Sequence, residues 1–204
     1  MINQNFIWLA LAIALVGSLY YIKDTLHGNT RPNRVTFFLW GAAPLIAYYA
    51  QRSGGGGIQI LYTLIIAIVP FFIFAASFVN KQAFWKITKF DVTCGVFSFI
   101  ALLSLFAIGN PMLALLLSVA ADFFAALPTI IKSYRYPETE TTFTYAAEIA
   151  SSAIVLLTIH KWAFINYFFV IYILVMNIMF TTILVMPRKR TIATLGSIDT
   201  TFKK

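Results

Sequence analysis

Two carboxylates lie inside apolar stretches of this sequence, where charged side chains are rare. Asp122 lies in VAADFFAALPTIIK, and Glu148 lies in TTFTYAAEIASSAIVLL. At ~1.5 Å per helical residue, Asp122 is about 15 Å from Lys132 and Glu148 is about 12 Å from Glu140. The two side chains are therefore predicted to lie at a similar depth on adjacent antiparallel helices. Acidic groups at such depth commonly hold a cation or exchange a proton.

Neither carboxylate has a Lys or Arg at the same depth. Because an isolated charge is costly away from water, each is expected to carry a proton or to pair with a cation that comes and goes. The structural alternative is a protonated carboxyl group that bonds a neighbouring serine or carbonyl group, for example Ser118 for Asp122 or Ser152 for Glu148, and so joins helices. We favour the functional interpretation for the pair.

Trp40 and Asn177 are predicted to lie at a comparable level. Trp40 is about 9 Å from Arg34, and Asn177 is about 13 Å from Met186, if both segments are helical. Core packing and substrate binding are both compatible with each residue. The predicted substrate-binding set is thus Trp40, Asp122, Glu148 and Asn177.

Three prolines fall inside the apolar stretches and are candidate hinges: Pro44, Pro70 and Pro128. Proline removes one backbone hydrogen bond and tends to kink a helix. Membrane helices tolerate single prolines, but three of them indicate a bundle that can bend around a central cavity.

The elements that must position these residues follow from composition. The chain has 204 residues, of which 60% are hydrophobic and 11% are charged, which is typical of a membrane protein. Runs of about 20 apolar residues cross a bilayer as helices. We predict an all-α membrane protein with seven spans at 4–22, 34–51, 57–80, 90–108, 111–132, 140–160 and 164–186. The first run follows MINQN, which has no Lys or Arg, so it is interpreted as a retained helix.

Basic residues predict the orientation of these spans. Thirteen of the 15 would share one side of the membrane: Lys23, Arg31, Arg34, Lys81, Lys86, Lys89, Lys132, Arg135, Arg188, Lys189, Arg190, Lys203 and Lys204. Only Arg52 and Lys161 would lie opposite. The positive-inside rule then places the N-terminus outside and the C-terminus in the cytoplasm. We expect the protein in the plasma membrane, the inner membrane of a bacterial cell. This topology accounts for the net charge of +8 with membrane lipids as partners and without nucleic acid.

Several function classes are disfavoured. The loops are short, and the sequence contains no GxxxxGK[ST], HExxH or GxSxG motif, so we expect no enzyme and no cofactor. His27 and His160 are predicted on opposite faces, which excludes a shared metal site. Retinal proteins need a lysine deep in the last helix, and residues 164–186 contain none.

The segment ADFFAALPTIIKSYRYPETET, Ala121 to Thr141, resembles the PQ-loop motif of the SWEET and PQ-loop transporter superfamily. GSLYYIKDTLHGNTRPNRVTFFLW, Gly17 to Trp40, resembles the same unit in the first half. The resemblance implies a three-helix bundle in 1–80, a linker helix in 81–110, a second bundle in 111–187 and a cytoplasmic tail in 188–204. A shift of 108 residues pairs Ile22 with Ile130, Thr36 with Thr144, Phe37 with Tyr145 and Trp40 with Glu148.

The sequence also departs from the family pattern. Pro128-Thr129 replaces Pro-Gln, and Glu148 stands where two-fold symmetry suggests a second aromatic residue. The resemblance implies that Trp40 and Asn177 line the site, as in sugar carriers, and that Asp122 is similar to the embedded aspartate of proton-coupled relatives.

We expect a transporter that moves a small polar solute by alternating access, with a proton or cation coupled to it or a cationic substrate. The alternatives are a neutral sugar facilitator and a seven-helix sorting or ligand receptor. One protomer could enclose the whole pathway, and a homo-oligomer is also compatible with the sequence.

Overall fold

The computed structural model describes residues 1–83, 85–104 and 109–187, and every regular element within them is helical. The all-α class is therefore confirmed, while the predicted tail 188–204 lies outside the described residues. The α-helices are α1 (Phe6–His27), α2 (Arg34–Ser53), α3 (Ile60–Ala76), α4 (Lys89–Ser104), α5 (Pro111–Arg135), α6 (Thr142–Thr158) and α7 (Phe164–Val185). Two short 3-10 helices, η1 (Lys81–Ala83) and η3 (Pro137–Thr139), lie in the connections.

Three of these helices, α1, α5 and α7, are long and apolar enough to cross a membrane, and α3 and α6 are shorter apolar helices. The outer surface is apolar as well. Trp8 is 58% exposed, Phe72 60% and Val175 57%. Large apolar side chains this exposed on several helices favour an interaction surface such as lipid, and the apolar helices are compatible with insertion into a membrane.

Local sequence explains where the helices begin and end. Asn110 caps α5, because its side-chain oxygen accepts from the backbone N–H of Met112 at 2.9 Å, and Pro111 is the first helical residue, as predicted. The first helix continues to His27, beyond the predicted end at residue 22. It stops there because Gly28 adopts the left-handed conformation, with φ of 81°.

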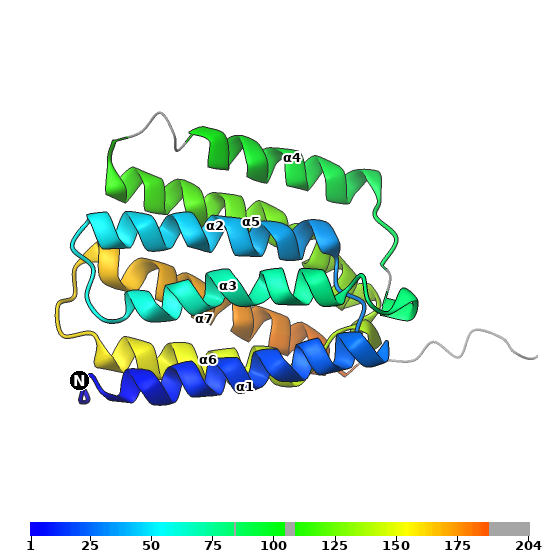
Figure 1. Ribbon diagram of the computed structural model, residues 1–204, viewed down its shortest axis with the longest axis horizontal. Coiled ribbons are helices and arrows are strands. Elements are labelled where there is room, and N and C mark those ends of the chain that lie inside the picture. Colours follow the sequence, from blue (N-terminus) through cyan, green and yellow to red (C-terminus); the bar gives the residue numbers. More distant parts are fainter. Residues whose placement is uncertain (84, 105–108, 188–204) are drawn as a thin grey trace, which may run out of the picture.

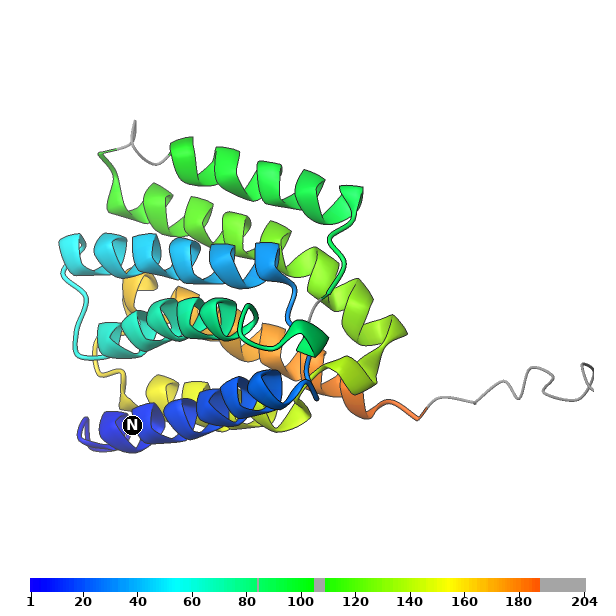
Figure 2. The same ribbon diagram turned by 45° about the vertical axis from the view of Figure 1, so that its right-hand side comes forward.

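The helices lie roughly side by side, successive ones run in opposite directions, and α4 lies at one edge of the molecule (Figures 1 and 2). α1 packs against α3 and α6, and α5 packs against α7 and α2. α4 packs on α5 and α2. The helices of Asp122 and Glu148, α5 and α6, are consecutive and run in opposite directions, but they make little direct contact with each other (Figure 1). α5 packs mainly on α2 and α4, and α6 packs on α1 and α7.

Small polar side chains join the two halves of the chain. Four hydroxyl groups donate to backbone carbonyl oxygens across the α1–α6 and α2–α5 contacts, at 2.7 to 2.8 Å: Thr36 to Ala125, Thr144 to Gly17, Ser118 to Ala43, and Ser151 to Ala10. At Gly17 the approach is so close that an added Cβ would lie 2.7 Å from the Cβ of Ala147. These contacts bring the helices together around a central cavity.

Candidate functional site

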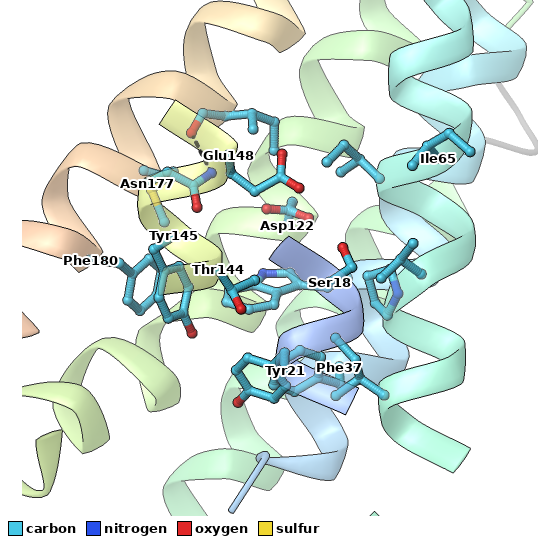
Figure 3. Close-up of a pocket in the computed structure, with 17 residues that line it drawn as sticks. Ser18, Tyr21, Phe37, Ile65, Asp122, Thr144, Tyr145, Glu148, Asn177 and Phe180 are labelled. Carbon is cyan, nitrogen blue, oxygen red and sulfur yellow. Dashed lines mark hydrogen bonds between the residues drawn. The ribbon is translucent and has the colours of Figure 1, made fainter. Parts of the chain in front are cut away.

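The cavity lies between the two halves of the chain and has a volume of about 100 Å³. Its walls come from α1, α2, α3, α5, α6 and α7. The four residues predicted from the sequence, Trp40, Asp122, Glu148 and Asn177, all line it. Asp122, Glu148 and Asn177 point into this space in Figure 3, together with Ser18 from α1. A single water needs about 10 to 15 Å³, so the cavity has room for a small solute or several waters.

Each of the two carboxyl groups is buried and accepts a hydrogen bond from a tyrosine. Asp122 is 4% exposed and accepts from the Tyr172 hydroxyl at 2.7 Å. Glu148 is 7% exposed and accepts from the Tyr62 hydroxyl at 2.8 Å. The tyrosines stand on α7 and α3, so each carboxyl group is held from a neighbouring helix rather than from its own.

The serines proposed as structural partners do not bond these carboxyl groups. Ser118 donates to the Ala43 carbonyl oxygen at 2.8 Å, and Ser152 donates to the backbone oxygen of Glu148 at 2.6 Å. Only these two serine partners are wrong, because each serine finds a backbone acceptor on its own or a packed helix. The structural alternative remains, with a tyrosine in place of the serine as the group that joins each carboxyl group to another helix. Among the residues that line the described cavity there is no Lys or Arg. No basic group there neutralises the two acids.

Trp40 packs against two aromatic rings and has one unsatisfied polar atom. Its ring makes edge contacts with Phe37, at 5.2 Å between centroids, and Phe180, at 5.7 Å. The indole nitrogen is buried and has no hydrogen-bond partner among the described atoms. A buried indole N–H usually finds an acceptor, so a ligand in the cavity is a natural source of one.

Asn177 is anchored to its own helix. Its amide nitrogen donates to the Ile173 carbonyl oxygen at 2.8 Å (dashed in Figure 3). The amide oxygen accepts no hydrogen bond from a described residue. The amide is thus held in place by one bond while its acceptor is available to a ligand.

One end of the cavity is closed by a polar network around Glu140. Tyr21 and Tyr145 both line the cavity, and both hydroxyl groups donate to Glu140 Oε2 at 2.8 Å. Lys132 forms a buried ion pair with Glu140 Oε1 at 2.6 Å. The ammonium group also donates to the backbone oxygen of Arg31, which brings in the α1–α2 connection.

This network was not predicted from the sequence. Lys132 and Glu140 were expected at the membrane-surface ends of two spans, and Tyr21 and Tyr145 had no predicted role in the site. Lys132 is instead buried in the last turns of α5, because the helix continues to Arg135. A lysine and a glutamate flanking one short connection are a weak signal, since charged loops are usually solvated.

The opposite end of the cavity is closed by apolar packing. Ile7, Leu11, Leu115 and Phe169 belong to one buried cluster near the N-terminal ends of α1, α5 and α7. Tyr62 belongs to the same cluster, with its hydroxyl group at Glu148. The cavity is thus bounded by a hydrogen-bonded network at one end and an apolar cluster at the other.

The three prolines lie at different places relative to the cavity. Pro70 lines it, whereas Pro44 and Pro128 are buried inside α2 and α5. Pro128 stands between Asp122, which faces the cavity, and Lys132, which belongs to the closing network. A bend at Pro128 would therefore move Asp122 relative to Lys132.

The arrangement can hold a cation or move a proton at two carboxyl groups, and it can contact a small solute through aromatic faces, one indole N–H and one amide. No group of three or more potential metal ligands occurs among the described residues. No protein-family model, no curated protein and no solved structure matches this chain.

Proposed function

We propose that this protein is a membrane transporter that moves a small polar solute by alternating access, coupled to a proton or specific for a cationic solute. The observation that carries this proposal is the central cavity, in which two buried carboxyl groups stand between the halves of the chain with no basic partner among the described residues. Buried acids without a fixed counter-charge suit a site that is filled and emptied during a cycle.

The proposal includes seven membrane spans with the N-terminus outside. Successive helices run in opposite directions, which supports a multi-pass path (Figure 1). The helix ends and connections on one side hold most basic residues of the described chain: Lys23, Arg31, Arg34, Lys81, Lys86, Lys89, Lys132 and Arg135. A cytoplasmic location of that end follows from the positive-inside rule.

The proposal also includes two three-helix repeats of the SWEET and PQ-loop type, joined by α4. The packing supports it, because α1 contacts α3 and α6 in the way that α5 contacts α7 and α2. α4 lies at the edge, as a linker would (Figure 2). In such an assembly a bend within the halves opens the cavity to one side at a time.

A neutral-solute facilitator is the second candidate, and the position of Trp40 and Asn177 in the cavity favours it. An aromatic face and an amide can bind a sugar without any charge. The two candidates differ in the part played by Asp122, which is essential in the first and auxiliary in the second.

Flux measurements on purified protein in liposomes test the proposal. Radiolabelled amines, amino acids and sugars would be screened as solutes, and a trapped pH-sensitive dye would report proton movement. We expect at least one solute to be taken up in a pH-dependent manner, with Asp122→Asn abolishing that dependence. Glu138→Gln is the matched control, because Glu138 is an exposed residue of η3, in the connection between α5 and α6. The same rate and pH profile in Asp122→Asn and parent would establish the neutral facilitator, and saturable binding without flux would indicate a receptor.

A further inference from the structure

A second recess lies outside the central cavity, on the apolar outer surface. α2 packs against both α3 and α4, whereas α3 and α4 make little direct contact with each other. Between them runs a groove of about 560 Å³. Its walls are apolar and aromatic, with α2 as the floor: Val35, Phe38, Phe74, Phe78, Val96 and Phe99.

The groove is held open by its surroundings. At Gly95, α4 lies so close to α2 that an added Cβ would be 2.8 Å from a methyl carbon of Val35. On the other side, the Arg34 guanidinium group donates to Ser77 Oγ at 3.0 Å and to the Ser77 carbonyl oxygen at 2.6 Å. These contacts fix α4 and the end of α3 on α2, with the groove between them.

One end of the groove carries positive charge. Arg34 lines this end, with its guanidinium carbon 3.9 Å from the centre of the Phe78 ring. The exposed Lys89 lines a shallow depression that shares Ile87 and Val92 with the groove. Asp91, the nearest acid along α4, is 3% exposed and accepts a hydrogen bond from Asn33 at 2.8 Å. Its charge is therefore directed inward, away from the groove.

We infer that this groove binds an anionic phospholipid, with one acyl chain along α2 and the phosphate beside Lys89 and Arg34. The apolar walls suit a hydrocarbon chain, and two cations at one end suit an anionic headgroup at the membrane surface. A neutral lipid would bring no net negative charge to the exposed Lys89. A second copy of the chain, placed side by side in the same orientation, would bring its own basic end against this one, which like charges disfavour.

The test compares two lipids that differ only in headgroup. The purified full-length protein would be given equal amounts of palmitoyl-oleoyl phosphatidylglycerol and phosphatidylcholine, and bound lipid counted by native mass spectrometry. We expect phosphatidylglycerol to be enriched. Lys89→Gln should reduce the enrichment about fivefold, the effect of one cation near an anionic surface. Lys23→Gln, another exposed lysine at the same end of the helices, should leave it unchanged.

A second pair of variants tests the groove itself. Val96 is 51% exposed in the groove and Val175 is 57% exposed on α7. Val96→Trp should fill the groove and lower retained lipid, whereas Val175→Trp should not. Equal binding of both lipids, or the same loss in both lysine variants, would overturn the inference. A dimer that Val96→Trp dissociates, with no bound lipid lost, would instead assign the groove to a second copy of the chain.

Discussion

The two buried acids are similar in chemistry but differ in what their tyrosine partners join. The Tyr172–Asp122 hydrogen bond connects α7 and α5, which both belong to the second half of the chain. The Tyr62–Glu148 hydrogen bond connects α3 to α6 and therefore crosses from the first half to the second. If the halves move relative to each other, the second bond is the one expected to break.

This difference gives the first prediction for single residues. Tyr62→Phe removes a bond between the halves and should change the ratio of outward-open to inward-open protein. The free-energy difference between the two states should shift by about 1.5 to 3 kcal/mol, the range for a hydrogen bond to a charged group. Tyr172→Phe should leave that ratio near the parent value and alter the pH dependence of flux instead. Distance measurements between spin labels on the two halves would report the ratio. Equal shifts in both variants would contradict the proposed movement.

Trp40 allows binding and packing to be separated. Trp40→Phe keeps an aromatic ring near Phe37 and Phe180 but removes the indole N–H, which has no partner in the described structure. Losing an unsatisfied buried donor should cost little folding stability. Affinity for a transported solute should fall about tenfold if that solute accepts the N–H bond, which is worth about 1.4 kcal/mol. Thermal melting with and without solute would measure both, and a parental affinity would make Trp40 a packing residue.

For single residues, the sequence predicted which side chains line the cavity better than it predicted their hydrogen-bond partners. The four cavity residues could be found because each is polar or aromatic at an unusual depth, and depth follows from counting residues along a helix. Their hydrogen-bond donors could not be found in the same way. Tyr62 and Tyr172 differ from the other tyrosines only in the direction in which their side chains point. That direction depends on how each helix is rotated about its axis, which is set by the helices packed beside it.

The helices were likewise predicted in part: their existence followed from the sequence, but some of their ends did not. The apolar runs predicted all seven α-helices of the described chain, and Asn110-Pro111 predicted the start of α5. The helix end that holds the closing network was not predicted, because α5 continues to Arg135 and places Lys132 inside the protein. A buried Lys is rare unless it is paired, and its pairing with Glu140 depends on the connection folding back over the helix end. Hydropathy alone does not indicate whether the connection after α5 folds back over the helix end.

Pro128 provides the prediction for this helix. In α5 its ring excludes one backbone hydrogen bond between the cavity and the closing network. Pro128→Ala would restore that bond and stiffen α5, so solute exchange should slow several-fold while equilibrium affinity changes little, because Asp122 lies about two turns away. Counterflow rates and equilibrium binding would be measured on the same preparation. Unchanged exchange would show that α5 does not bend at this proline.

For the whole molecule, the hydrogen bonds between the halves occur in matched pairs. The shift of 108 residues that pairs Thr36 with Thr144 also pairs Gly17 with Ala125. Thr36 donates to the carbonyl oxygen of Ala125, and Thr144 donates to that of Gly17. The same shift relates the Ser118–Ala43 bond to the Ser151–Ala10 bond. Apart from Thr36 and Thr144, the matched residues differ in type, so most of these pairs are hard to recognise in the sequence. They support the proposal that the two halves are repeats related by an approximate two-fold axis.

The matched pair also has one difference that can be measured. Thr36 Oγ1 accepts from Thr129 at 3.0 Å in addition to its own bond to Ala125, whereas the Thr144 hydroxyl group bonds one partner among the described residues, Gly17. Thr144→Val should lower the unfolding free energy by about 0.6 kcal/mol, the average for a hydrogen bond between membrane helices. Thr36→Val should cost more, because it leaves the buried Thr129 hydroxyl without its acceptor.

A double variant tests this reason for the difference. Thr36→Val with Thr129→Val removes both hydroxyl groups, so its cost should be smaller than the sum of the two single variants. Thr144→Val with Thr129→Val should be additive, since Thr144 and Thr129 share no hydrogen bond. Unfolding in mixed micelles would give all the free energies under one condition. Equal costs for Thr36→Val and Thr144→Val, with additivity in both double variants, would mean that the two contacts between the halves are energetically identical and that Thr129 has no part in either.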